Sequence, residues 1–230
     1  MHPSPNFGPR RDGARPDMVV IHYTAMTSAQ EARDWLCNPQ AEVSAHYVIS
    51  RRGTVWQLVD EDMRAWHAGA GVWGCVSDVN SRSVGIELAN TGAEPFPEPQ
   101  MAALEDLLRG ITARWQVPPE RVIGHSDLAP GRKIDPGPRF DWRRLARQGL
   151  AVWPVDDLEA EGGNTPAELD DLGKTLEAIG YTSDADMETK LAAFRLRYRP
   201  AATGPASRAD RALALKVARD YPVDPVARNA

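Results

Sequence analysis

The chain has 230 residues, 42% of them hydrophobic, and a formal net charge of −5 at pH 7. This length and composition suit one main globular domain with a small appendage. We expect no nucleic-acid partner, because no basic run interleaved with aromatic residues occurs, and no membrane span, because no stretch reaches about 18 apolar residues.

The N-terminus and the cysteines bear on the compartment. Residues 1–17 contain no apolar core of a signal peptide, so the chain as it stands is predicted to be cytoplasmic. If a leader was removed ahead of residue 1, the protein would be periplasmic or envelope-associated. Cys37 and Cys75 form no CxxC pair; we expect reduced thiols, with a single bridge as the alternative. We expect a monomer.

Strands and helices alternate through the first two thirds of the chain. Period-two alternation of apolar residues predicts strands over Met18–Tyr23, His46–Ser50, Thr54–Val59, Ser83–Asn90 and Arg121–Ile123. Helical composition, or apolar residues at 3.6-residue spacing, predicts helices over Ser28–Cys37, Pro99–Trp115 and Asp141–Gln148. This order predicts an α/β fold, with a mixed central β-sheet flanked by helices.

The segment GHSDLAPGRKIDPG, Gly124–Gly137, is too rich in Gly and Pro for a helix and is predicted to be a loop. In an extended backbone Lys133 and Asp135 point to one side and Ile134 to the other, where it would anchor the loop. His125 reaches the same point if the loop folds back. An imidazole and a carboxylate form part of a catalytic zinc site, which keeps three protein ligands and one open position.

His22 is the candidate for the third ligand. It lies near the end of MVVIHY, on the strand face opposite Val19, Ile21 and Tyr23, which aims it at a pocket. The alternative for any single strand histidine is a hydrogen-bonded structural residue. The three residues together favour a metal site.

Glu87 interrupts the apolar strand SVGIELAN. A carboxylate in such a strand is usually paired or used in chemistry, because its burial is costly. Beside a metal site it would act as the general base in the hydrolysis of a carbonyl compound. Lys133 would then stabilise the developing oxyanion. The alternatives are an edge strand that leaves Glu87 in solvent and an ordinary surface lysine.

An ordered set of motifs carries a family resemblance. From about Pro5 to Trp153 the segments VVIHYTA, SAHYVISRRGTVWQLV, RAWHAG, NSRSVGIELAN and RVIGHSDLAPGRKIDPGPRFDW follow one another. This order resembles the zinc-dependent N-acetylmuramoyl-L-alanine amidases of the amidase-2 family, relatives of phage lysozyme-type amidases and of animal peptidoglycan-recognition proteins. The resemblance implies a fold of the same α/β type.

The resemblance also implies roles and a substrate. It makes His22, His125 and Asp135 the ligands of one Zn²⁺, Glu87 the catalytic carboxylate and Lys133 the stabiliser of the transition state. The implied substrate is the amide between N-acetylmuramic acid, or its 1,6-anhydro form, and L-alanine in peptidoglycan or muropeptides, in cell-wall turnover or recycling. The alternative is a non-catalytic protein that binds muropeptides; such relatives typically lose a metal ligand, and all three are present here.

Three further residues are placed near the cleft by the resemblance. His46, in SAHYVIS, and Trp66 and His67, in RAWHAG, are expected to face the substrate or to support the metal site. For the two histidines the alternative is a purely structural role. Neither is expected to bind zinc.

The composition changes after Val155. We predict a catalytic domain over residues 1–155, an acidic, glycine-containing linker over 156–164 and a small helical domain over 165–230. Its three helices are predicted from a capping box at Thr165 to Ile179, over Asp184–Tyr198 and over Ser207–Tyr221. They resemble a peptidoglycan-binding module, although AAFRLRYRP lacks the usual glutamine. The alternative is a packing appendage; so small a unit is expected to dock on the first domain.

Overall fold

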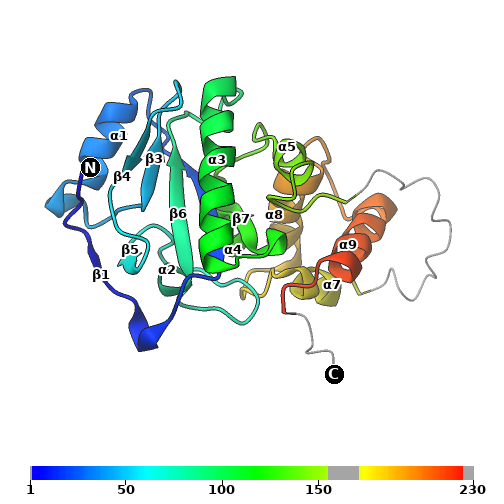
Figure 1. The fold of residues 1–230 in the computed structure, drawn as a ribbon. Coiled ribbons are helices and arrows are strands. Elements are labelled where there is room, and N and C mark those ends of the chain that lie inside the picture. Colours follow the sequence, from blue (N-terminus) through cyan, green and yellow to red (C-terminus); the bar gives the residue numbers. More distant parts are fainter. Residues whose placement is uncertain (1, 155–170, 225–230) are drawn as a thin grey trace.

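The computed structural model describes residues 2–154 and 171–224 and is built around a five-stranded sheet (Figure 1). Its strands lie in the order β4-β3-β6-β2-β7. Strands β3, β6, β2 and β7 are parallel, and β4 is antiparallel to β3. The bounds are β2 Met18–Tyr23, β3 Tyr47–Ile49, β4 Val55–Gln57, β6 Ser83–Leu88 and β7 Val122–Gly124. The predicted mixed sheet is confirmed, with three of its strands shorter than predicted.

Smaller elements surround the sheet. A separate two-stranded antiparallel sheet, β1 Phe7–Pro9 and β5 Met63–Ala65, was not predicted. The α-helices of the first region are α1 Ala29–Leu36, α2 Val79–Arg82, α3 Glu98–Trp115, α4 His125–Leu128 and α5 Trp142–Ala146. Three 3-10 turns lie at Arg11–Gly13, Pro39–Ala41 and Pro119–Arg121. None of the helices in the described part of the chain is long and apolar enough to cross a membrane.

Both faces of the inner strand β2 are buried, as expected for a parallel strand covered on both sides. Val19 and Ile21 face α3, where they share a core with Leu104 and Leu108. Met18 and Val20 face the other way, into a second core. On that second face α1 covers the β3 end of the sheet, where its Leu36 packs with Val48 of β3. The sheet is thus a middle layer.

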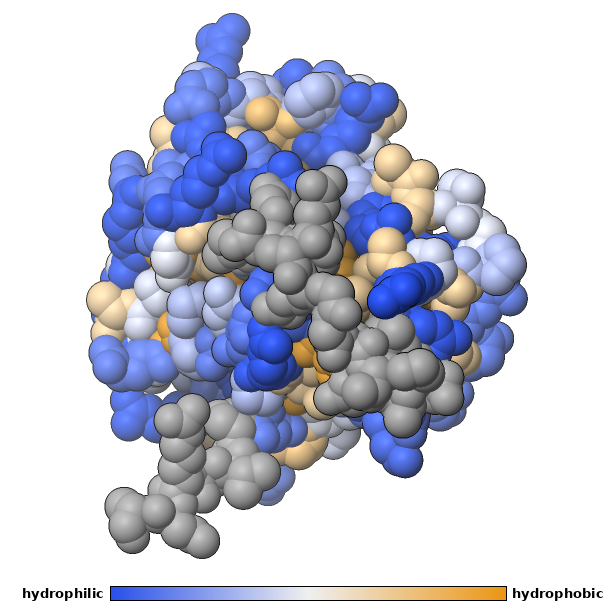
Figure 2. All heavy atoms as spheres, turned by 90° about the vertical axis from the view of Figure 1, so that its right-hand side faces the viewer, coloured by the Kyte–Doolittle hydropathy of each residue, from blue (hydrophilic) through white to orange (hydrophobic). Residues whose placement is uncertain are grey.

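The C-terminal helices cover the β2–β7 end of the same second face. They are α7 Leu172–Ile179, α8 Met187–Tyr198 and α9 Arg208–Asp220, and lie to the right of β7 in Figure 1. Leu176, Phe194 and Val217 join Met18 and Val20 in one core. The expected docking is confirmed. The outer surface of the described residues, seen from this side, is mostly hydrophilic (Figure 2).

The starts of these helices differ in part from prediction. Helix α7 begins after Asp171, whose side chain accepts a hydrogen bond from the Lys174 amide. The capping box at Thr165, the linker and the proposed boundary at 155 lie outside the described residues. Helix α9 begins with a capping box, in which Ser207 and Asp210 bond reciprocally. Binding of peptidoglycan by this module stays a prediction.

Candidate active site

The predicted site residues lie on the second face of the sheet, between α1 and the C-terminal helices. His22 in β2 and Glu87 in β6 are register partners. Because side chains alternate along strands, the two point to the face opposite α3. His125 follows β7 directly, and Asp135 lies in the loop beyond α4. The ends of neighbouring parallel strands therefore bring the four together, where α/β sheets commonly place ligand sites.

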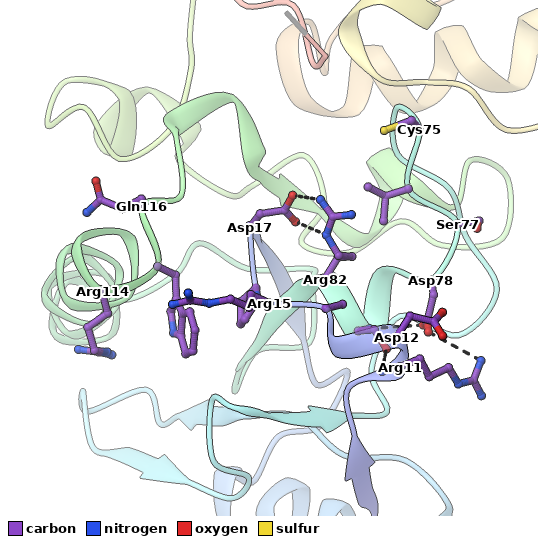
Figure 3. Close-up of a pocket in the computed structure, with 15 residues that line it drawn as sticks. Arg11, Asp12, Arg15, Asp17, Cys75, Ser77, Asp78, Arg82, Arg114 and Gln116 are labelled. Atoms are coloured by element: carbon purple, nitrogen blue, oxygen red, sulfur yellow. Dashed lines mark hydrogen bonds and ion pairs between the residues drawn. The ribbon is translucent and has the colours of Figure 1, made fainter.

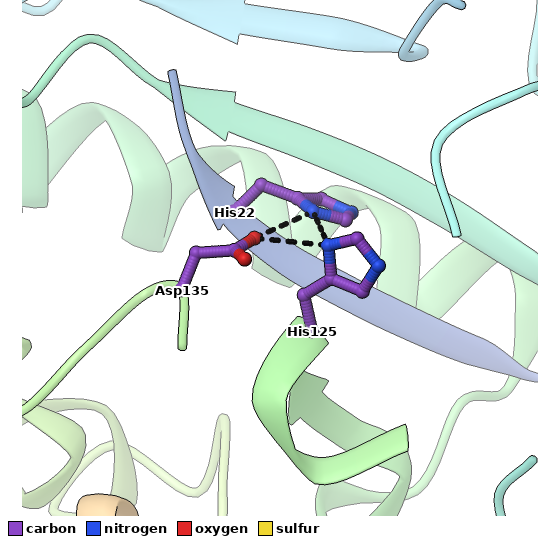
Figure 4. A group of neighbouring side chains, drawn as sticks. All are labelled: His22, His125 and Asp135. Atoms are coloured by element: carbon purple, nitrogen blue, oxygen red, sulfur yellow. Dashed lines mark hydrogen bonds and ion pairs between the residues drawn. The ribbon is translucent and has the colours of Figure 1, made fainter. Parts of the chain in front are cut away.

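His22, His125 and Asp135 converge on one point (Figure 4). The Nδ1 atoms of the two histidines are 3.0 Å apart, and Oδ2 of Asp135 lies 2.9 Å from His22 Nδ1 and 3.1 Å from His125 Nδ1. All three side chains are buried. Figure 4 shows that they come from a strand, a helix start and a loop.

The hydrogen bonds made by the Nε2 atoms of His22 and His125 determine the tautomers of the two rings, and hence whether their Nδ1 atoms carry a proton. His125 Nε2 donates to the Ala68 carbonyl at 2.9 Å, which leaves its Nδ1 without a proton in the neutral ring. Ser83 gives its only hydroxyl hydrogen to the Val79 carbonyl, so its oxygen accepts from His67 Nε2 at 3.2 Å. His67 Nδ1 then accepts from His22 Nε2 at 3.0 Å, which leaves His22 Nδ1 unprotonated too.

The Nδ1 lone pairs of His22 and His125 and the Oδ2 atom of Asp135 therefore face one another in a buried site. Burial, together with the charge that His125 would carry, lowers the pKa of His22 to about 4, so the ring is neutral at pH 7. Three acceptors at this spacing repel one another unless a cation lies between them. Two imidazoles and one carboxylate are the ligand class of catalytic zinc, and the orienting bonds to the far ring nitrogens are typical of metal-bound histidines. The residues fit a metal ion.

Glu87 lies next to these ligands. Burial and the nearby Asp135 carboxylate raise the pKa of Glu87 to about 8. Its Oε2 is buried and has no hydrogen-bond partner among the described residues. Glu87 and Lys133 both line a cleft of about 550 Å³ that also exposes His22, His125 and Asp135. A carboxyl group with a free oxygen and a pKa close to neutral is suited to transfer protons in such a cleft.

The loop after β7 departs from prediction in two ways. Its first residues form the helical turn α4, because the Asp127 carboxylate accepts a hydrogen bond from the Gly124 amide at 2.8 Å and caps the turn. Ile134 does not anchor the loop; its side chain is 60% exposed at the rim of the cleft. Lys133 and Asp135 do share the cleft.

Known proteins are similar to this chain in sequence and fold. The family model described as N-acetylmuramoyl-L-alanine amidase matches residues 12–138. The amidase AmiD of Escherichia coli is 35% identical over 209 residues, which cover 80% of this chain and 75% of AmiD. The 1,6-anhydro-N-acetylmuramyl-L-alanine amidase AmpD of Enterobacter cloacae is 33% identical over 160 residues, 62% of this chain and 86% of AmpD.

The chain belongs to the N-acetylmuramoyl-L-alanine amidase family. The structure of E. coli AmiD with its substrate anhydro-N-acetylmuramic acid-L-Ala-D-gamma-Glu-L-Lys has a TM-score of 0.82 to the present one at 34% identity, and covers 91% of each chain. AmpDh3 of Pseudomonas aeruginosa in complex with anhydromuramic pentapeptide has a TM-score of 0.78 at 29% identity, covering 92% of this chain and 94% of its own. The predicted family, fold and enzyme class are confirmed.

The remaining sequence-predicted residues of this amidase divide between cleft and core. Trp66 lines the cleft, and His67 both lines it and holds His22. The ring of His67 lies against β6, where Gly85 makes room: a Cβ there would lie 2.4 Å from His67 Cγ. His46 does not reach the cleft. It is 0% exposed, with Nδ1 accepting from the Gly85 amide at 2.9 Å and Nε2 3.1 Å from the Met63 carbonyl.

Two contributions to the amidase cleft were not predicted. Trp35, on α1, is 50% exposed and lines the cleft wall; a tryptophan on an otherwise polar helix face was the available signal. Arg132 donates to the carbonyl of Ala68 at 2.8 Å and to that of Ala70. It thereby ties the His67 loop to the loop of Lys133, a long-range contact that no local pattern indicates.

A second cavity, of about 700 Å³, lies at the other edge of the sheet, where β2 and β6 begin (Figure 3). Its charged groups neutralise one another: Asp17 accepts from Arg82 and from Arg121, and Arg11 pairs with Asp78 at 3.7 Å. Cys75 lines this cavity, and neither Cys75 nor Cys37 is joined in a disulfide in the structure. That both thiols are reduced stays a prediction. None of the proposed metal ligands or catalytic residues lines this cavity.

Proposed function

We propose that this amidase holds one zinc ion on His22, His125 and Asp135 and hydrolyses the amide between the lactyl group of N-acetylmuramic acid and L-alanine. The observation that carries the proposal is the convergence of three unprotonated donor atoms beside a buried, unpartnered carboxylate oxygen. The chemistry that the ion supplies is Lewis acidity toward the scissile carbonyl and toward water.

The protein groups divide the proton and charge transfers between them. Glu87 takes the proton from the attacking water, and its raised pKa suits it to pass that proton to the leaving amine of L-alanine. Lys133, which lines the same cleft, stabilises the negative charge that develops on the carbonyl oxygen. The neighbouring His67 keeps His22 in the tautomer that offers Nδ1.

We infer that soluble muropeptides ending in 1,6-anhydro-N-acetylmuramic acid are among its substrates. The similarity to AmiD, whose structure holds such a compound, and to AmpD supports this inference. A non-catalytic binding role finds no support, because the metal ligands, Glu87 and Lys133 all meet in one cleft.

Mass spectrometry of products tests the proposal. Purified muropeptides with reducing and with anhydro ends are each incubated with the zinc-loaded chain, and we expect free peptide stems that begin with L-alanine. Treatment with EDTA should abolish their release, and added Zn²⁺ should restore it. Full activity in a preparation that elemental analysis shows to be metal-free would refute the zinc assignment.

A further inference from the structure

The carboxylate of Asp127, which caps α4, is bound by two residues of the C-terminal helical region. Asp127 lies two residues after His125 and is 1% exposed. Its Oδ1 accepts a hydrogen bond from the Tyr181 hydroxyl at 2.7 Å, and its Oδ2 pairs with the Arg197 guanidinium at 3.1 Å. Tyr181 follows α7 and Arg197 belongs to α8. Both lie beyond residues 12–138, which the family model matches.

The ion pair between Arg197 and Asp127 is fully enclosed. Arg197 is 4% exposed; it also donates to the Val122 carbonyl of β7 at 3.3 Å and lies 4.1 Å from the ring centroid of Trp142. A buried ion pair tolerates loss of one partner badly, because the remaining charge has neither water nor counter-ion. Removing Arg197 would leave the Asp127 carboxylate in that condition, at the base of the turn that begins with His125.

A second contact reaches the same loop farther along. Gly131 has a positive φ of 75°, and a Cβ there would lie 2.8 Å from Cγ2 of Thr189 in α8. Leu128, at the end of α4, is buried in the core shared with Phe194. The segment from His125 to Lys133 therefore packs against the C-terminal helices at three residues, which are Asp127, Leu128 and Gly131.

We propose that Tyr181 and Arg197 are positioning residues of the amidase, which act through Asp127 to keep His125 Nδ1 directed at His22 and Asp135. The inference rests on the proposed function, because the metal ion is what the aligned ligands hold. It gives the C-terminal helices a part in building the metal centre.

Zinc affinity of Tyr181→Phe and Arg197→Met, measured by competition with a chelator, tests this role. We expect a loss on the order of tenfold for each variant, with a larger loss for Arg197→Met, as for residues that orient metal ligands. The absorption spectrum of the Co²⁺-loaded proteins should also change, because it reports ligand geometry. Arg197→Lys should recover part of the affinity.

Arg195→Met is the matched control. Arg195 lies in the same helix but pairs with Asp210 of α9 at 2.6 Å, away from α4. We expect it to lower the melting temperature while zinc affinity stays within about twofold of wild type. If Tyr181→Phe, which removes only one hydroxyl, kept wild-type affinity and Co²⁺ spectrum, the positioning role would be refuted. A wild-type chain that bound no zinc would instead overturn the proposed function, and this inference with it.

Discussion

His67 supports the metal site through a hydrogen bond to His22, one of the proposed ligands. It accepts from His22 Nε2 at 3.0 Å and is itself fixed by Ser83. Replacing it by alanine frees the tautomer and orientation of a metal ligand, which typically costs 10–100-fold in metal affinity. We expect a loss in that range for His67→Ala by chelator competition. His46→Gln is the control: it changes a fully buried histidine outside the cleft and should lower stability with little change in zinc affinity.

Glu87 and Lys133 are proposed to act in the transition state and are not among the ligands. We therefore expect Glu87→Gln and Lys133→Met to lower kcat on the order of 100-fold or more, with near-stoichiometric zinc. Steady-state kinetics on a soluble muropeptide and metal analysis of the same preparations check this. A variant that lost its zinc, or kept a normal kcat, would contradict the role given to that residue.

The raised pKa of Glu87 predicts a pH dependence of stability in the metal-free protein. With a folded pKa of about 8 and an ordinary value of 4.5, the folded state keeps a proton that the unfolded chain has lost above pH 4.5. The stability contributed by the protonated carboxyl is fully present below pH 4.5 and is lost as the pH rises through 8. Above pH 6.5 the buried ring of His22, with a lowered pKa, stays neutral.

Between pH 6.5 and 8 we accordingly expect the unfolding free energy of EDTA-treated wild type to fall by about 1–2 kcal/mol relative to that of Glu87→Gln, at roughly 1.4 kcal/mol per pH unit for one proton. The buried His22 and His46, which are neutral when folded and partly protonated when unfolded near pH 6.5, contribute alike in both proteins. Urea unfolding curves of both proteins at the two pH values provide the measurement. If the unfolding free energy changed equally with pH in both proteins, Glu87 would be ionised in the folded metal-free state, and the prediction would be wrong.

Local patterns predicted the individual site residues well where one strand or loop decides the direction of a side chain. Strand alternation placed His22, and the composition of one loop paired His125 with Asp135. His46 shows the limit. Its position in the predicted strand His46–Ser50 resembles that of His22, but His46 lies just before β3. Its environment is set by Met63 and by Arg10, which lies 36 residues earlier and is 3.3 Å from its Nε2. Such long-range partners leave no trace in the local pattern.

At the scale of elements, α1 contributes the apolar wall of the cleft. Its Trp35 exposes half of its surface there, and Ile134 is exposed at the same cleft. Exposed apolar side chains at a cleft typically bind substrate. We expect Trp35→Ala to raise the KM for soluble muropeptides severalfold while kcat and zinc content change little. An unchanged KM would remove Trp35 from the binding surface.

The elements themselves were predicted where one periodic segment carries the signal. Helix α3 begins one residue before its predicted start and ends where predicted, because its apolar residues repeat at helical spacing from Met101 to Ile111, about three turns. Strands β1 and β5 were missed because each has three residues and exists through pairing with the other. Helix α4 was missed because the capping carboxylate of Asp127 outweighs the general loop character of the segment.

At the scale of the whole molecule, the sequence predicted that three C-terminal helices dock on the catalytic region, but not that they complete its core. Apolar stripes on short helices look the same whether they pack on one another or on a sheet. Here Leu176, Phe194 and Val217 share one core with Met18 and Val20 of β2. The buried Arg197–Asp127 pair joins the same two regions.

Truncation after residue 154 should therefore disable the enzyme. It would expose Met18, Val20, Ile123 and Leu128, each fully buried now. Exposure of each such side chain costs about 1.5–3 kcal/mol, so the four together approach or exceed a typical domain stability of about 5–15 kcal/mol. We expect loss of cooperative unfolding in thermal melts and loss of activity on soluble muropeptides as well as on polymeric wall. A truncated chain that melted cooperatively and cleaved soluble muropeptides at the wild-type rate would show that the C-terminal helices are dispensable for the metal centre.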